Sequence, residues 1–198
     1  MSRFLLIVIA AAALAASAAA QVATWQIDPA HTSAQFSVKH LGVSTVRGAF
    51  TKVSGSAKFD SADPAKTSLE ATIDAASVDT RVEMRDNDLR SPNFFDVAKY
   101  PALTFKSKKV EAGAAGKLKV TGDLTINATT RQVVLAVDGP SQAVKDAQGR
   151  QKIGLSAEVK INRKDFGITW NEVLETGGFA VADEVSITLD IELIWNDK

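Results

Sequence analysis

The stretch HTSAQFSVKH, residues 31–40, contains both histidines of the chain, so it could hold a metal site or a catalytic pair. Apolar and polar residues alternate along it, which predicts a β-strand with one dry and one wet face. Nine residues at roughly 3.3 Å each place the two imidazoles about 30 Å apart, on opposite faces. A shared metal ion is therefore not expected, and without any cysteine a zinc site would lack its commonest partners. We interpret His31 as a residue that fixes the turn after Asp28-Pro29. We interpret His40 as a hydrogen-bonding residue on the dry face, at the end of the strand.

A second group of reactive side chains is the run RDNDLR, residues 85–90, whose two aspartates could perform acid–base chemistry. A helix with alternating charges is more often a salt-bridged, solvated face. The segment NRKDFG, residues 162–167, follows an expected strand and is typical of a turn. Its Arg163 could pair with Asp86 or Asp96, or face the head group of a ligand. Because the sequence contains no nucleophile elbow, phosphate loop, dinucleotide fingerprint or metal-binding helix motif, an enzyme is the weaker class.

The elements that would position these residues are almost all strands. Period-2 alternation, interrupted by Gly, Asp, Asn or Pro, predicts eight of them. One-sided strands without intervening helices favour an antiparallel sheet that folds on itself as a barrel or a sandwich. The expected strands are residues 25–40, 46–60, 68–75, 103–110, 117–126, 131–138, 152–162 and 184–195.

The interval between the third and fourth expected strands has a different pattern. Thr80-Arg81-Val82-Glu83 matches a capping box, which predicts a helix that runs to Arg90. Ser91-Pro92 then predicts a second helical start and a short turn, which Pro101 ends. This polar and aromatic insert is expected to cover an end or a side of the sheet, as a lid or an entrance.

The N-terminus combines one arginine, an apolar run and small residues, which is typical of a secretory signal peptide. We expect residues 1–20 to be cleaved after Ala20, which leaves a single domain of residues 21–198, exported to the periplasm without a stable membrane anchor. That domain has 22 basic and 23 acidic residues, so no positive surplus favours nucleic acid. It has no disulfides, so its stability must come from the core.

The expected dry faces contain several small residues, including Gly55, Ala57 and Ala71. Their size affects whether the interior of a barrel is filled by side chains or left open. Eight strands close a barrel just wide enough to fill with side chains or to hold one ligand. Small inward residues favour an open lumen that could take a long apolar chain. The alternative is that they let a helix or an aromatic ring pack closely.

Four stretches carry a resemblance to a known family. They are WQIDPAHTSAQFSVKHLGVSTVRGAF from Trp25, RDNDLRSPNFFDVAKYPALTFKS from Arg85, GDLTINATTR from Gly122 and INRKDFGI from Ile161. In order and spacing they resemble the YceI family of exported bacterial lipid-binding proteins. The resemblance implies an all-β fold, an eight-stranded antiparallel lipocalin-like barrel with a short helical insert between strands 3 and 4. It also implies that Arg85, Asp86 and Asp96 form a structural clamp that holds the insert to the barrel, because the family pattern RDxxLRS is not catalytic.

We therefore predict a periplasmic or secreted binding protein, not an enzyme, that carries or sequesters a polyisoprenoid, quinone-type or fatty-acyl lipid in the lumen. The alternatives are an enzyme acting on an isoprenoid lipid and a stress-response scaffold with no ligand. We expect no cofactor and no metal, and the bound lipid is the ligand. For the oligomeric state, the sequence is compatible with a monomer and with a homodimer. His40 and Arg163 are the expected polar residues of the mouth. The apolar residues expected to line the lumen are Phe36, Val38, Phe50, Gly55, Ala57, Ala71, Phe94, Phe95, Phe105, Phe166, Ile168 and Trp170.

Overall fold

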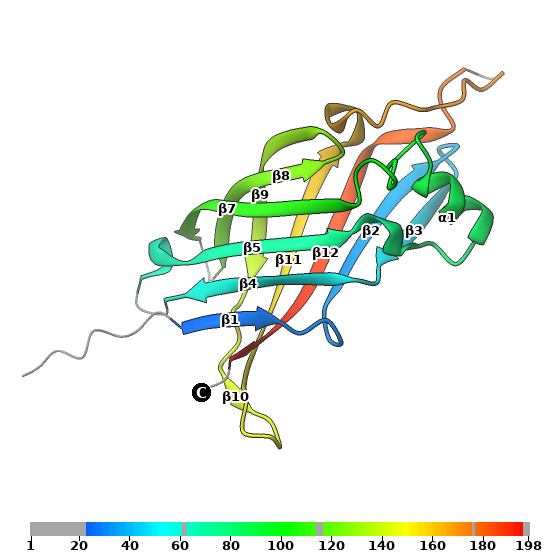
Figure 1. Ribbon diagram of the computed structural model, residues 1–198. Coiled ribbons are helices and arrows are strands. Elements are labelled where there is room, and N and C mark those ends of the chain that lie inside the picture. The colour runs from blue at the N-terminus through cyan, green and yellow to red at the C-terminus, as the bar shows by residue number, and fades with distance from the viewer. Residues whose placement is uncertain (1–22, 61–62, 114–116, 176, 196–198) are drawn as a thin grey trace, which may run out of the picture.

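The computed structural model describes residues 23–60, 63–113, 117–175 and 177–195, so the expected signal peptide lies outside the described residues (Figure 1). The described residues form one antiparallel sheet that closes on itself where β11 pairs with β12. Its strands are β1 (Ala23–Ile27), β2 (Ser33–His40), β3 (Ser44–Phe50), β4 (Val53–Phe59), β5 (Ser68–Asp74), β6 (Val78–Asp79), β7 (Ala102–Ala112), β8 (Leu118–Ile126), β9 (Thr129–Asp138), β10 (Val144–Lys145), β11 (Gln151–Asn162) and β12 (Val181–Trp195).

The twelve strands of this sheet correspond to the eight walls of the predicted barrel. Three of the walls are bent, and each of these consists of two consecutive strands. The first wall consists of β1 and β2, which are separated by a turn at residues 28–32. β1 pairs with Leu193 and Ile194 of β12, and β2 pairs with residues 181–190 of the same strand. β3 and β4 are separated by residues 51–52, and β5 and β6 by the 3-10 turn η2 (Ala75–Ser77). The two-residue β10 only extends the edge of β11. The eight-stranded antiparallel barrel is thus confirmed, and the bends within its walls were not predicted.

Alternation along the strands sends one set of side chains inward. In β2, Ala34, Phe36 and Val38 lie opposite Leu189, Ile187 and Val185 of β12, and residues that pair across an antiparallel ladder share a face. The core around this lumen contains Trp25, Phe50, Val78, Leu193 and other buried apolar residues. A second cluster around Val110, Val120 and Ala157 fills the end of the barrel near the β7–β8 connection.

The helical insert lies between β6 and β7, with α1 (Glu83–Arg90) followed by turns through residue 100. The predicted capping box is wrong, because the residue that precedes the helix is Val82 and it has no side-chain cap. Ser91 accepts a hydrogen bond from the amide of Asn93 at 3.2 Å, and a turn follows as expected. The insert, the β2–β3 turn and the segment that follows η4 (Arg163–Phe166) all gather at one end of the barrel (Figure 1). None of the helices in the described residues is long and apolar enough to cross a membrane.

Candidate functional site: an apolar cavity in the barrel

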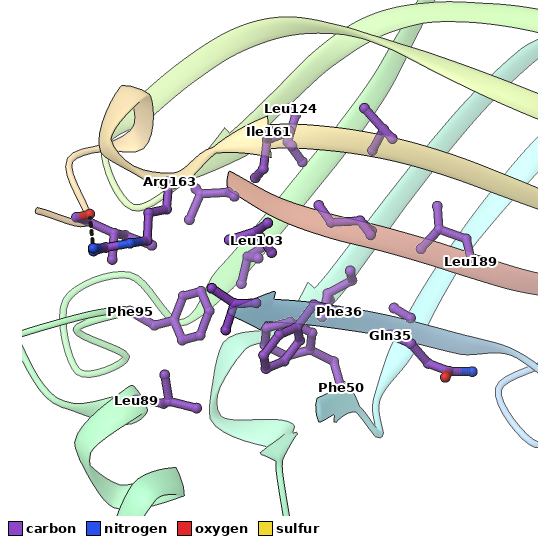
Figure 2. Close-up of a pocket in the computed structure, with 18 of the residues that line it drawn as sticks. Gln35, Phe36, Phe50, Leu89, Phe95, Leu103, Leu124, Ile161, Arg163 and Leu189 are labelled. Atoms are coloured by element: carbon purple, nitrogen blue, oxygen red, sulfur yellow. Dashed lines mark hydrogen bonds between the residues drawn. The ribbon is translucent and has the colours of Figure 1, made fainter. Parts of the chain in front are cut away.

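A cavity of about 360 Å³ runs inside the barrel, within the range of small-molecule sites. It follows β2 from Ser33 to His40, a length of roughly 23 Å at 3.3 Å per residue. Of its 37 lining residues, 29 are apolar and come from strands all around the barrel. The eight polar ones lie toward its two ends: Thr32, Ser33 and Gln35 at one, and His40, Arg85, Asp88, Arg163 and Glu172 at the other. Figure 2 shows this separation, with Gln35 at the far end of the cavity from Arg163.

The end near Gln35 is closed by packed side chains. Trp25 and Trp195 contact each other with their ring centroids 5.8 Å apart, and Leu193 is 1% exposed. Ile27 lies beside them, buried, and borders the cavity. These side chains pack that end of the barrel, and we take the other end, beside His40, as the mouth of the cavity.

Charged residues surround the turn between β1 and β2. The Oδ2 atom of Asp28 lies 2.8 Å from Nδ1 of His31 and 3.5 Å from Nζ of Lys152, and Lys152 also lies 2.5 Å from Oε1 of Glu192. The hydrogen bond with His31 is the main cause that lowers the pKa of Asp28 to about 2, with the amide of Ala30 and the charge of His31 adding to it against the effect of burial. His31 therefore fixes this turn, as predicted.

Asp28, His31 and Glu192 also have ligand atoms close enough together to hold a metal ion. Lys152 already supplies a positive charge to both carboxylates at contact distance. The ammonium of Lys152 already balances the charge of these carboxylates, so we interpret this group as an ion-pair network that ties the β1–β2 turn to β11 and β12.

Aromatic side chains form the roof of the cavity at the mouth end. Phe36 and Phe50 lie 5.9 Å apart between ring centroids, and Phe50 meets Phe95 of the insert edge-on at 5.4 Å. Phe94 contacts Trp170 at 5.4 Å. The first two contacts join β2 and β3 to the insert, as Figure 2 shows for Phe36, Phe50 and Phe95, and the third joins the insert to the segment after η4. The insert thus covers the mouth, the place proposed for a lid.

Arg163 borders the cavity, but its guanidinium has no donor left for a ligand. Nε donates to the carbonyl of Ala182 at 3.0 Å, and Nη1 donates to the carbonyls of Ile168 at 2.9 Å and Trp170 at 2.8 Å. Nη2 donates to the carbonyl of Val181 at 3.3 Å and to Asp183 at 3.5 Å. A guanidinium has five N–H groups, so all are used.

Burial lowers the pKa of Arg163, partly offset by the charge of Asp183. Neither Asp86 nor Asp96 pairs with Arg163 among its bonds in the described residues, which corrects both expected partners. Its role is to hold the segment 163–183 across the mouth.

The other expected polar residue, His40, does lie at the mouth, opposite Ser44 and Val181. Its imidazole forms no hydrogen bond with another described residue, so the hydrogen-bonding role expected of it is not filled within that part of the chain. The neighbouring Arg85 uses Nε and Nη2 on Thr80, and its Nη1 has no partner among the described residues. Together with the carboxylates of Asp88 and Glu172, these two side chains are the polar groups that line the cavity at the mouth beside Arg163.

The structure brings most of the expected apolar lining residues to the cavity. Gly55, Ala57 and Phe166 do not border it. Ala57 packs at the closed end opposite Trp25, and Phe166 is 2% exposed within η4, in the core. A Cβ at Gly55 would lie 2.2 Å from the carbonyl oxygen of Glu70, so this glycine permits a close approach of two strands. Those on the cavity wall are Phe36, Val38, Phe50, Ala71, Phe94, Phe95, Phe105, Ile168 and Trp170.

Two of the small residues support the alternative interpretation of close packing. A Cβ on Gly48 would lie 2.5 Å from the ring of Phe36, and a Cβ on Gly122 would lie 2.4 Å from the ring of Phe105. These glycines therefore let aromatic rings approach the backbone closely and do not themselves create lumen.

The clamp that holds α1 centres on Thr80. The buried carboxylate of Asp86 accepts hydrogen bonds from the amide of Thr80 at 2.8 Å and from its hydroxyl at 2.5 Å. Arg85 donates to the same hydroxyl at 2.7 Å and to the carbonyl of Thr80 at 3.0 Å. Asp96 acts differently, through its backbone at φ 44°, where its carbonyl accepts from the amides of Lys99 and Tyr100.

Sequence reasoning missed several residues of the site. Arg90 extends the clamp, donating to the carbonyls of Ala76 at 2.8 Å and Val78 at 2.6 Å. Asn127 donates to the carbonyl of Phe94 at 2.9 Å and so ties the insert to the β8–β9 turn. Four lining residues of β12 were also missed. The period-2 pattern places them on one face of a strand, but it does not show that this face is turned to the lumen. They are Val185, Ile187, Leu189 and Ile191.

Comparison with known proteins shows relatives along most of the chain. Residues 25–193 match the model of a YceI-like domain. A UPF0312 protein of Vibrio cholerae is 36% identical over 170 residues, which cover 85% of this chain and 89% of the relative. A UPF0312 protein of Staphylococcus aureus is 34% identical over 165 residues, covering 83% of this chain and 94% of the relative.

Similar folds occur in three proteins or domains of known structure. BcnA of Burkholderia cenocepacia superposes with a TM-score of 0.71 at 30% identity, covering 84% of this chain and 98% of BcnA. A YceI protein of Campylobacter jejuni has a TM-score of 0.66 at 34% identity, covering 80% and 90%. A polyisoprenoid binding domain from Saccharophagus degradans has a TM-score of 0.63 at 16% identity, covering 89% and 100%.

Proposed function

Because this chain belongs to the YceI family, we propose that its barrel is a binding protein that carries or sequesters one long apolar lipid. The observation that carries the proposal is the cavity, with 29 apolar residues among 37 and its polar residues at the two ends. Such a lining suits a ligand whose long middle part makes no hydrogen bonds, because a buried polar group without a partner is costly. The polyisoprenoid binding domain contributes a shared fold to the argument and, at 16% identity, no more.

The chemical class of the ligand follows from the shape of the site. A cavity that runs the length of β2 and is closed by Trp25 and Trp195 suits an unbranched or regularly branched chain that enters end first. Its polar head would lie at the mouth, beside His40 and the unpaired Nη1 of Arg85. Polyisoprenoid, quinone-type and fatty-acyl lipids all fit this description.

The place of action is proposed from the N-terminus. The apolar run of residues 4–16 and the small residues before Gln21 suit a cleaved export signal, and the mature protein would act in the periplasm. Sequencing the N-terminus of protein from a periplasmic fraction should give a start at or near Gln21, and an intact Met1 there would contradict the proposal.

The experiment that tests the function is mass spectrometry of lipid extracted from the purified protein. We expect one apolar lipid class close to one molecule per barrel, and recovery of binding when the delipidated protein is returned to that lipid. A protein that yields no lipid and takes none up would be a scaffold. Release of a chemically altered lipid over time would instead indicate an enzyme.

A further inference from the structure

Exposed apolar side chains are concentrated around the mouth of the barrel. Among the described residues, nine large apolar side chains are exposed, and Val134 and Val144 are the two that lie elsewhere. The other seven occupy the β2–β3 turn, the start of α1 and the segment after η4. We call them the mouth rim: Leu41 (44% exposed), Val43 (85%), Val82 (42%), Met84 (82%), Trp170 (37%), Val173 (72%) and Phe179 (53%).

The backbone holds these side chains outward. The amide of Leu41 donates to the carbonyl of Ala180 at 2.8 Å, which joins the β2–β3 turn to the segment after η4. Val173 and Phe179 face each other in a short antiparallel bridge. Leu41 adopts φ 55°, a conformation that favours Gly or Asn and is uncommon for a large apolar residue. Turn geometry therefore does not explain the choice of leucine there, whereas a contact made by its exposed side chain would.

The third segment belongs to the same end of the molecule. β3 pairs with β6 at Phe50 and Val78, and a Cβ at Gly48 would meet the side chain of Thr80, so the chain after β6 runs alongside β3 toward the β2–β3 turn. Val82 and Met84 follow directly on that path. The three segments thus lie at the same end of the barrel (Figure 1).

Charges on these segments are nearly balanced. Residues 39–47, 81–85 and 164–179 contain five basic side chains (Lys39, Arg47, Arg81, Arg85 and Lys164) and four acidic ones (Glu83, Asp165, Glu172 and Glu175). Attraction to an anionic surface would require a clear basic surplus. Any attachment through the mouth rim would therefore depend on burial of its apolar side chains.

We propose that the mouth rim docks on the surface of a lipid bilayer, with Val43, Met84 and Val173 entering the interface. The inference rests on the proposed function, because the partner is identified from the cavity. The cavity extends to this end, where His40, Arg85 and Trp170 line it, and most of its lining is apolar, so a ligand that enters at the mouth must pass the mouth rim. A long apolar chain that crossed water would expose its whole length to solvent, which is unfavourable in proportion to the apolar area exposed. Docking of the rim lets the chain pass from bilayer to cavity without that exposure.

The test is co-sedimentation with vesicles of phosphatidylcholine, a zwitterionic lipid. The variant Val43→Ser/Met84→Ser/Val173→Ser removes the most exposed rim side chains, none of which borders the cavity. Val134→Ser/Val144→Ser is the matched control, because it removes exposed apolar side chains away from the mouth. We expect the rim variant to bind vesicles at least about tenfold more weakly, since interfacial binding scales with buried apolar area. The control and a change from about 0.05 to about 0.5 M NaCl should have little effect.

The outcomes separate docking from lipid carriage. Equal vesicle binding by the rim variant and the unsubstituted protein, or no vesicle binding by either, would overturn the docking proposal. If lipid still extracts from the purified protein in those cases, the carrier function stands without it. A rim variant that changes only the sedimentation coefficient of the protein, from dimer to monomer, would assign the rim to self-association and also overturn the proposal. Vesicle binding by a protein that holds no lipid would support docking and contradict the carrier function.

Discussion

Replacement of Arg163 by methionine gives the sharpest test of the structural role assigned to it. The guanidinium is 5% exposed and makes three short hydrogen bonds, to the carbonyls of Ala182, Ile168 and Trp170 at 2.8–3.0 Å. Hydrogen bonds from a charged donor contribute about 1.5–3 kcal/mol each, so the gross contribution is roughly 4.5–9 kcal/mol. Burial of the charge itself costs several kcal/mol, so we expect a net loss of about 3–5 kcal/mol in the free energy of unfolding.

Equilibrium unfolding in urea measures this loss. Arg163→Lys should be nearly as destabilising as Arg163→Met, because an ammonium has three donors from one nitrogen and cannot reach the same set of carbonyls. The exposed Arg47 supplies the control, and Arg47→Met should change stability by less than about 0.5 kcal/mol. If the Arg163→Met variant were as stable as the unsubstituted protein but had a reduced lipid affinity, the structural role would be refuted and Arg163 would again be a head-group ligand.

Three further predictions concern the lumen, the closed end and the clamp. Ala71→Trp places a ring in the cavity, so lipid content should fall while the ligand-free protein keeps its stability; a loss of about 1–3 kcal/mol would instead indicate a filled core. The pKa of Asp28 is lowered from 3.8 to about 2, so the ionised carboxylate adds about 2 kcal/mol to the free energy of unfolding. This contribution is complete above about pH 4–5 and is lost as the pH falls toward 2. Asp28→Asn should remove that part of the pH dependence of the melting temperature. If the melting temperature of this variant fell between about pH 5 and 2 as steeply as that of the unsubstituted protein, the stabilising interaction of Asp28 with His31 would be excluded. Asp86→Ala leaves the amide and hydroxyl of Thr80 without their acceptor, so stability should fall by about 1–3 kcal/mol and proteolysis within residues 83–101 should accelerate; a protein unchanged in both would contradict the clamp.

Period-2 alternation was enough to predict an antiparallel sheet that folds on itself as a barrel or a sandwich, because each strand has one face in the core and one in solvent. The resemblance to the YceI family indicated the eight-stranded barrel. The alternation could not show the bends. Residues 25–40 continue the alternation on both sides of the turn at Asp28-Pro29, and only their shared pairing with β12 reveals that β1 and β2 are separate strands.

Parity was also insufficient to locate the cavity along the barrel axis. Ala57 and Ala71 both point inward, but Ala57 lies beside Trp25 at the packed end and Ala71 lies on the cavity wall. That difference depends on which large side chains fill each level of the barrel, and those come from distant strands.

Local motifs failed where tertiary contacts competed with them. The Thr80 hydroxyl matched a capping box, but it bonds to the buried carboxylate of Asp86, six residues later, and not to the start of the helix. Arg163 was correctly placed at the mouth, yet its partners are carbonyls up to 19 residues away, which no local spacing indicates.

The pairing of β12 with β2 has a consequence for how the chain folds. Ala34 pairs with Leu189, so the ladder between the first long strand and the last joins residues 155 positions apart. Non-local pairings of this kind slow folding, because the entropy of closing a long loop is lost before the contacts form. During synthesis, the open edges of β2 and β11 have no partner until residues 181–195 have left the ribosome. The nascent protein therefore cannot complete its barrel before the last strand is made, and a truncation that removes β12 would leave both edges free to pair with other chains.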